Sequence, residues 1–312
     1  MTEHALTAEP THSRWNRALE PRLVIASGDV VHMECADSSG SQLGPASTLE
    51  DFLAIDRGRI HALSGPIFIE GAGPGDVLEI DVLDVRHKGW GWSSIIPGLG
   101  FLKDRFPDPY FFLWKLDAAV TRSLEPAIVP LRPFCGVMGV APAADGEFRT
   151  RPPGAFGGNM DVRELCAGAK LYLPVFNRGA LFSAGDPHAA QGDGEVCING
   201  IECPADATLR LRLHRGRSIP GPLIESSERL GPDLGRDAYI VVESAPDALE
   251  AARAATSRMI DLLVDRWSLS SIHAYLLCSV AMNLRLSQVV NEPMITVSAA
   301  LPKQVLPAVT LI

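Results

Sequence analysis

The chain has 312 residues, of which 46% are hydrophobic and 21% charged, with a formal net charge of −9 and a pI near 5.4. This length and composition allow a large core and exclude a disordered or fibrous protein. The acidic balance and the lack of a Lys/Arg cluster argue against a nucleic-acid partner, and they favour a small neutral ligand over an anionic one unless a local basic pocket exists.

The N-terminal sequence and the cysteines bear on compartment and metal chemistry. Residues 1–21 lack the apolar core of a signal peptide, and the longest apolar stretch, roughly 271–284, is too short for the about 20 residues of a membrane span. We therefore expect a cytoplasmic protein with no membrane partner. The six cysteines form no CxxC pair, so any metal must be held by histidine and carboxylates.

The first two thirds of the chain are typical of β-structure. From about 21 to 86, short runs of alternating apolar and polar residues predict strands, as in GDVLEIDVLDV. Residues 89–158 contain many Gly and Pro, which exclude long helices and indicate ordered loops around a cleft or further short strands. Strands are expected again at 170–176, 195–203 and 206–214, and in the last of these Leu209 and Leu211 alternate with Arg210 and Arg212, as in a sheet with one solvent-facing side.

The pattern changes to helical after AYIVVESAPD. Ser244 and Asp247 offer N-cap chemistry, and apolar residues then recur near the helical period at Leu249, Ala252, Met259, Ile260 and Leu263. A second helix is expected after Ser268, followed by an extended segment at 295–303. We predict a mainly β protein, with β-sandwich or barrel-like sheets and a smaller α+β portion near the C-terminus. Residues 1–20 would form an N-terminal arm, and 21–312 a single unit with its helical element at about 244–290.

One segment, 157–202, concentrates groups that could carry chemistry. Hard oxygen ligands and an imidazole suit zinc or another divalent ion, and the glycines between them let loops converge. Asp-Pro and Gly-Asp-Gly also occur in ordinary turns. The strand 170–176 lies between the two acid-rich loops and could bring their ends together on one rim of a sheet, which favours a site. The polar residues are Asn159, Asp161, Asp186, His188, Asp193 and Glu195.

Several blocks of sequence together resemble the acetamidase/formamidase family, in the family's order and over most of the chain. They are GPIFIEGAGPGDVLEIDV at 65–82, PFCGVMGVAPA at 133–143, PPGAFGGNMD at 152–161, LYLPVFNRGALFSAGDPHAAQGDGE at 171–195 and RLSQVVNEPMITVSAALPK at 285–303. The resemblance implies a mainly β fold, a homo-oligomer of two or more subunits, a divalent metal site and hydrolysis of a short linear amide to a carboxylate and ammonia.

The resemblance also suggests site residues. Asn159 and Asp161 match the family's GGN-x-D loop, and Asp186, His188, Gln191, Asp193 and Glu195 match its GD-x-H-x-x-QGDGE loop. We expect Asp161, His188 and Glu195 to form the core of the metal site, with Asp186 and Asp37 as further ligands and zinc as the ion. Glu195 or Glu34 would act as the general base, and Asn159 or the backbone amides of Gly157 and Gly158 would hold the oxyanion.

Other functions remain open from the sequence. A nucleophilic amidase would need an activated residue, and no G-x-S-x-G elbow or motif marks a serine, Cys135 or Cys166. The fold could also act on a different or cyclic amide, or bind a small amide without turning it over. Trp90 and Trp92 could line the pocket or pack in the core.

Overall fold

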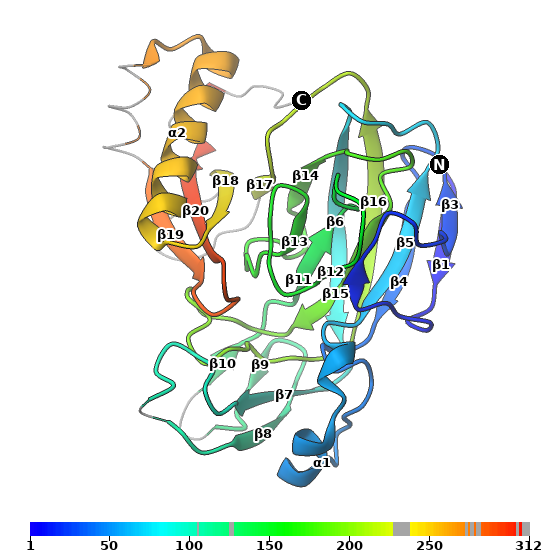
Figure 1. The fold of residues 1–312 in the computed structure, drawn as a ribbon, viewed down its shortest axis with the longest axis vertical. Helices are drawn as coiled ribbons and strands as arrows, with labels where there is room; N and C mark the ends of the chain where they lie inside the picture. Colours follow the sequence, from blue (N-terminus) through cyan, green and yellow to red (C-terminus); the bar gives the residue numbers. More distant parts are fainter. Residues whose placement is uncertain are drawn as a thin grey trace.

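Two β-sheets and one long helix form the framework of the protein (Figure 1). The structure is a computed structural model, and it describes residues 1–104, 106–124, 128–226, 238–271, 274, 278, 282–303 and 306–307. The larger sheet runs in the order β1 (Glu3–Leu6), β4 (Val30–Cys35), β16 (Ala205–His214), β6 (Val77–His87), β14 (Lys170–Pro174), β17 (Leu223–Ser226), β18 (Ala238–Ala245), β20 (Ile295–Pro302) and β19 (Asn283–Gln288). The smaller sheet runs in the order β13 (Gly157–Asn159), β11 (Phe134–Gly139), β15 (Phe182–His188), β5 (Leu63–Ile69) and β3 (Leu23–Ile25).

The main hydrophobic core lies between these two sheets. It draws Ile80 and Leu209 from the larger sheet and Ile67, Phe134 and Phe182 from the smaller one, all fully buried. Strands of both sheets therefore bury one face of alternating side chains, which is how two sheets stack into a sandwich. The prediction of a mainly β, sandwich-like protein is confirmed.

Strand β16 follows the predicted alternation. Leu209 and Leu211 are buried in the core, whereas Arg210 and Arg212 lie on the opposite face. There they reach across to β6, with Arg210 3.3 Å from Asp81 and Arg212 2.6 Å from Glu79. The outer face of the sheet is therefore a network of cross-strand ion pairs, as the sequence of the strand indicates.

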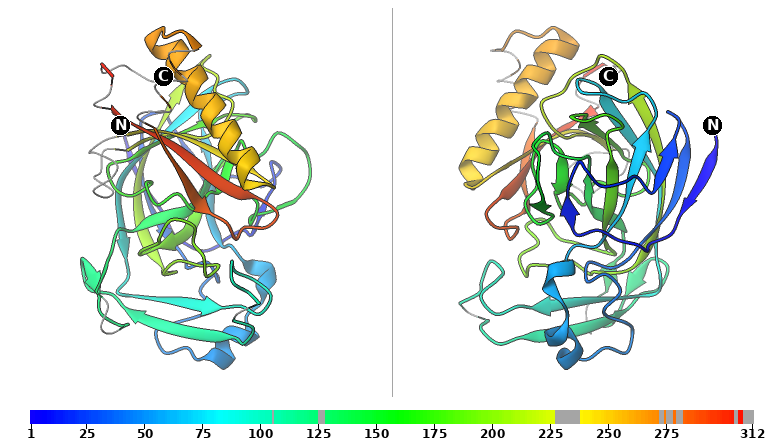
Figure 2. Two further views of the ribbon diagram at one scale, coloured as in Figure 1. Left: turned by 90° about the vertical axis from the view of Figure 1, so that its left-hand side faces the viewer. Right: turned by 45° about the vertical axis from the view of Figure 1, so that its right-hand side comes forward.

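Helix α2 (Ala248–Trp267) packs on strands β18 and β20 (Figures 1 and 2). Asp247 caps it by accepting from the backbone N–H groups of Leu249 and Glu250, both at 3.0 Å. Its buried residues are spaced by four, at Ala251, Ala255, Met259 and Leu263. Leu249, which we had placed on this stripe, is 57% exposed. The second predicted helix falls largely on residues outside those described.

Smaller elements extend the sandwich at one end. The hairpin β7 (Trp90–Ile95) and β8 (Tyr110–Lys115) projects there beside helix α1 (Leu49–Ala54) and the short 3₁₀ helix η1 (Arg57–Arg59) (Figures 1 and 2). Phe52 of α1 packs on Trp92 and Phe111, with ring centroids 5.6 and 5.3 Å away. The remaining two-stranded pairs are β9 (Val120–Thr121) with β10 (Val129–Pro130), and β2 (Arg14–Trp15) with β12 (Phe148–Arg149).

Two further predictions can be compared with the structure. Residues 195–203, which we expected to be a strand, form turns with isolated bridges, because Glu195 and Ile198 have φ values of 47° and 81° that an extended strand does not accept. Within residues 1–20, β1 lies parallel to β4, β2 pairs with β12, and Trp15 is buried. None of the described helices is long and apolar enough to cross a bilayer.

Candidate active site

Three adjacent strands of the smaller sheet bring the candidate residues together. Strand β11 pairs with β13 on one side and β15 on the other, so that Val137 lies opposite both Asn159 and Gly185. Asn159 ends β13, while Asp186 and His188 belong to β15. The prediction that strand 170–176 joins the two acid-rich loops was wrong, because β14 lies in the larger sheet; β11 joins them instead.

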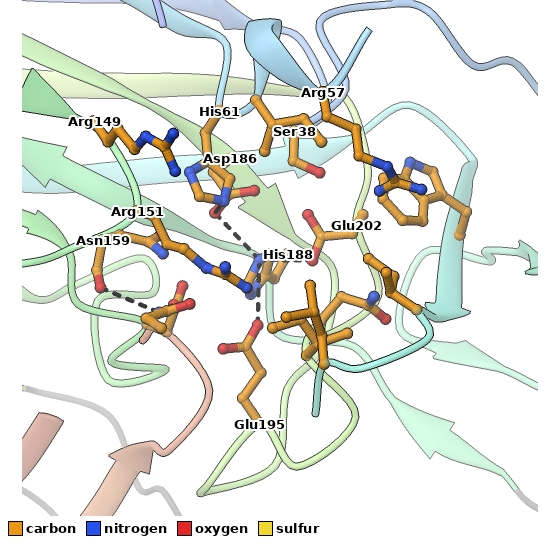
Figure 3. A pocket seen from close by; sticks show the side chains of 18 of the residues that line it. Ser38, Arg57, His61, Arg149, Arg151, Asn159, Asp186, His188, Glu195 and Glu202 are labelled. Atoms are coloured by element: carbon orange, nitrogen blue, oxygen red, sulfur yellow. Dashed lines mark hydrogen bonds and ion pairs between the residues drawn. The ribbon is translucent and has the colours of Figure 1, made fainter. Parts of the chain in front are cut away.

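The carboxylates converge in a cavity of about 410 Å³ (Figure 3). Four of the five predicted metal-site residues, Asp161, Asp186, His188 and Glu195, line it and are almost fully buried. A fifth buried group, Glu202, lies with them. Figure 3 shows Asp186 and Glu195 approaching His188 from opposite sides, with Glu202 to one side.

His188 is at the centre of this cluster. Its Nε2 lies 2.9 Å from Glu202 Oε1, 3.6 Å from Asp186 Oδ2 and 4.0 Å from Glu195 Oε1. Two groups of possible ligand atoms share this histidine, and within each group all atoms lie within 4.8 Å of one another. They are Asp161, Asp186 and His188, and His188, Glu195 and Glu202.

Gln191 fixes the ring of His188. The Gln191 Nε2 donates to the backbone carbonyls of Asp161 and Ser287, at 2.8 and 3.2 Å, so its Oε1 is left to accept. That oxygen lies 2.8 Å from His188 Nδ1. Nδ1 must then carry the hydrogen, and the lone pair of the neutral ring is on Nε2, directed at the carboxylates.

Gly136 of β11 leaves space for two of the acids. A Cβ at this position would lie 3.0 Å from Asp186 Oδ2 and 3.1 Å from the Asp186 carbonyl oxygen, and nearer still to Asp161 Oδ1. Real Cβ atoms do not make contacts this short with rigid neighbours. The glycine in the middle of a buried strand is therefore explained by the two carboxylates that lie against it.

Burial of so many acids shifts their ionisation. Burial raises the pKa of Asp161 to about 7, with a contribution from the charge of Asp186. Burial, with Asp161 beside it, raises the pKa of Glu195 well above its usual range. Burial alone would lower the pKa of His188, but Glu202 and Asp186 outweigh it and raise that pKa. The cluster contains four buried carboxyl groups and one central histidine, so a bound cation would stabilise the ionised carboxylates.

The unpaired atoms of the cluster fit a metal ion. Four buried carboxylate oxygens have no hydrogen-bond partner among the described residues: Asp161 Oδ1, Asp186 Oδ1, Glu195 Oε2 and Glu202 Oε2. Unsatisfied buried acceptors are costly, so native structures rarely keep several together. Carboxylate oxygens with one imidazole nitrogen form a donor set suited to a divalent ion such as zinc.

Three of the acids are held in an unusual backbone conformation. Asp161, Asp186 and Glu195 have φ values of 50°, 54° and 47°. Residues other than glycine rarely adopt the left-handed region, and such residues often cluster at functional sites. Each of the three turns its carboxylate toward the same cavity.

The remaining predicted residues lie elsewhere. Glu34 is exposed on β4 and does not line the cavity. Asp37 is buried, but it accepts from Trp92 Nε1 at 2.9 Å and from the backbone N–H of Ser41 at 3.0 Å, so it shapes a loop. Asp193 pairs with Arg163 at 3.0 Å. The structure therefore leaves Glu34 and Asp37 out of the cluster.

Sequence reasoning missed two groups at the site. Glu202 ends the acid-rich segment but matched no motif position, and only the turn at 195–203 brings it to His188. His61, which is not among the predicted ligands, lines the cavity with Nε2 4.0 Å from Asp186 Oδ2. Trp92 lines the cavity and also packs on Phe52, so both expectations for it hold.

The cysteines do not resemble nucleophiles. A hydrogen bond with Cys35 and complete burial raise the pKa of the Cys135 thiol well above its usual range. Cys166 is also buried. Neither lines the cavity, and a reactive cysteine needs a stabilised thiolate and access to substrate.

Known proteins are similar to this chain over much of its length. The sequence model described as the Acetamidase/Formamidase family matches residues 2–147 and 143–307. An acetamidase of Mycolicibacterium smegmatis is 29% identical over 67% of each chain, and a formamidase of Methylophilus methylotrophus is 30% identical over 61% of this chain and 60% of its own. The chain thus spans about two thirds of the length of these relatives or somewhat less.

A solved structure is similar over nearly the whole chain. The acetamidase of Bacillus halodurans superposes with a TM-score of 0.87 and 32% identity, covering 95% of this chain and 96% of its own. The family match spans most of the sequence, and the structural match covers the framework that carries the buried cluster. This chain therefore belongs to the acetamidase/formamidase family of amide hydrolases.

Proposed function

We propose that the protein hydrolyses a short linear carboxamide to a carboxylate and ammonia, using a divalent metal ion held by the buried cluster. The observation that carries this proposal is that four buried carboxylates cluster at His188 and that each keeps one oxygen without a hydrogen-bond partner among the described residues. The names of the relatives, acetamidase and formamidase, support the substrate class.

We assign the metal to His188 with Asp161 and Asp186, and we expect zinc. These three supply a nitrogen and two oxygens from neighbouring strand ends. When bound, a divalent ion at this position would polarise the amide carbonyl and make water more acidic. Glu202 Oε1 lies 2.9 Å from the same Nε2 and is therefore close enough to serve as a further carboxylate ligand.

Glu195 is our candidate for proton transfer. Its Oε2 has no partner among the described residues, and it faces the cavity from the side opposite Asp186 (Figure 3). A carboxylate in this place can take a proton from the attacking water and pass it to the departing nitrogen, which would otherwise be a poor leaving group. This keeps the role predicted for Glu195 and does not require the exposed Glu34.

Asn159 is our candidate for recognition of the amide group. Its side chain lines the cavity and is buried, and its Oδ1 has no partner among the described residues. The NH₂ group of a primary carboxamide would supply that missing donor. We assign Asn159 to binding the amide nitrogen, in place of the oxyanion role expected from the sequence.

The test is ammonia release from formamide, acetamide and propionamide, with metal content measured on the same samples. Turnover should disappear on chelation and return with zinc or another divalent ion. His188→Ala should abolish turnover and metal binding together, whereas the exposed Glu34→Gln should retain both. Turnover that persists after complete metal removal would refute the metal-dependent mechanism, and metal bound without turnover of any amide would favour a binding role or a different, for example cyclic, amide.

A further inference from the structure

Basic side chains collect on the wall of the cavity that also holds the acids. Arg14, Arg57, Arg149 and Arg151 all line it, although the chain as a whole carries a net charge of −9. Figure 3 shows Arg149 and Arg151 entering from the side of Asn159, and Arg57 lying across from them. A local basic pocket is the one feature that would reverse the sequence-based expectation of a neutral ligand.

Two of these arginines are already engaged. Arg14 donates from one guanidinium nitrogen to the carbonyls of Ser13 and Gly58, at 2.7 and 3.3 Å. Arg57 lies over the ring of Phe52, 5.2 Å from its centroid. Their positions are explained by the loops that they hold.

No contact of this kind explains the positions of Arg149 and Arg151. Within the described part of the chain, neither forms a hydrogen bond or an ion pair. Arg149 lies directly opposite Arg14 in the β2–β12 pair, an arrangement of like charges that destabilises a sheet. Arg151 is partly buried two residues further on. Burial lowers the pKa of its guanidinium, and the charges of Glu292 and Glu195 oppose this shift while that of Arg149 adds to it.

Arg149 is exposed and Arg151 half-buried, and both line the cavity without a hydrogen bond or ion pair to any described residue. Two such guanidinium groups can bind an anion. Arginine presents its N–H groups in a planar fork that matches a carboxylate, and it keeps its charge when partly buried. The same cavity holds the acid cluster, so one small molecule can reach both. At about 410 Å³, the cavity is within the range that holds drug-sized ligands, and a two-carbon amide would leave much of it to water.

We propose that the preferred substrate is an amic acid, the monoamide of a short dicarboxylic acid, whose free carboxylate is bound by Arg149 and Arg151 while its amide group meets Asn159 and the acid cluster. The inference rests on the proposed function for the amide end of the substrate, which would be hydrolysed, but not for the binding of its carboxylate end. The carboxylate would fix the orientation of the molecule, so that the uncharged end always faces Glu195 and His188.

The first experiment compares succinamic acid with its uncharged methyl ester and with butyramide. We expect kcat/KM for the acid to exceed that for the two uncharged amides by roughly 10- to 100-fold, the range of a charged hydrogen-bonded contact. Arg151→Gln should remove this preference by raising KM for the acid, with little change for butyramide. Arg17→Gln is the matched control, because Arg17 is a surface arginine paired with Asp145, and it should keep the preference.

A binding measurement separates this inference from the proposed function. Succinate should bind more tightly than butyrate by calorimetry, and Arg151→Gln should abolish the difference, whether or not any amide is hydrolysed. Equal rates for the charged and uncharged amides, or equal binding of succinate and butyrate, would overturn the inference. A loss of bound metal in Arg151→Gln would also overturn it, because the role of the arginine would then be to compensate the negative charge of the acid cluster.

Discussion

Replacing Gly136 by alanine tests whether the spacing of Asp161 and Asp186 is what binds the metal. The added Cβ would lie 3.0 Å from Asp186 Oδ2 and closer to Asp161 Oδ1, so at least one carboxylate must move. Overpacking of this kind costs about 1–3 kcal/mol of stability. Displacing a ligand or its support should lower the metal affinity roughly 10- to 100-fold, the loss seen when the groups that position ligands are altered.

Gly139→Ala is the matched control on the same strand. A Cβ there would lie 2.8 Å from both the backbone nitrogen of Gly158 and Cη2 of Trp15, so its cost in stability should be comparable, but it touches neither acid. Stability is measured by thermal unfolding of the metal-stripped variants, and affinity by competition with a chromophoric chelator. Unchanged affinity in Gly136→Ala, or an equal loss in both variants, would refute the argument that these two carboxylates are the positioned ligands.

Three further predictions concern the histidine, the buried charge and the helix. Gln191→Met removes the acceptor that fixes His188 Nδ1–H and should weaken metal binding roughly tenfold at unchanged fold, checked by the same chelator competition together with circular dichroism. Because burial raises the pKa of Asp161 from 3.8 to about 7, its contribution to stability is complete below about pH 4 and is lost as pH rises through 7. Metal-stripped protein should therefore melt at a lower temperature at pH 8 than at pH 5.5, with a loss of about 2 kcal/mol, since about 1.5 pH units at 1.36 kcal/mol each lie between pH 5.5 and the raised pKa. A melting temperature that is no more sensitive to pH than that of Asp161→Asn would contradict this. Met259→Ala, in the buried stripe of α2, should lower the free energy of unfolding by about 2–5 kcal/mol without changing metal affinity, and denaturant unfolding would measure it.

The parts of the fold that the sequence predicts are those in which a local period coincides with burial. The alternation of β16 and the Asp247 cap of α2 each appear where the pattern places them, because one buried face fixes the register of a strand or helix. The strand expected at 195–203 is absent. Residues of this segment have positive φ values, which occur in turns and not in extended strands. Leu249 is exposed because it lies two residues before Ala251 and therefore on the opposite face of the helix from the buried stripe.

The site was predictable only where a motif marked it. The motif residues Asp161, Asp186, His188 and Glu195 meet in one cavity. Glu202 ends the same acid-rich segment but matches no motif position, and the two arginines lie outside that segment. Glu202 reaches His188 through the turn at 195–203 and an isolated bridge between the two residues, whereas Arg149 and Arg151 are positioned by the pairing of β2 with β12. Contacts between residues so far apart in sequence follow from tertiary packing and cannot be read from local periodicity.

The left-handed backbone of Asp161, Asp186 and Glu195 has a consequence for directed evolution. Each residue keeps a conformation that glycine would adopt with about 1 kcal/mol less strain, and each adds a negative charge to a crowded interior. In a library screened for heat resistance alone, glycine or asparagine at these positions would therefore be enriched, and the enriched clones would be inactive. Thermostable catalysts from this scaffold would have to be selected for turnover in every round, with stabilising changes sought away from the three acids.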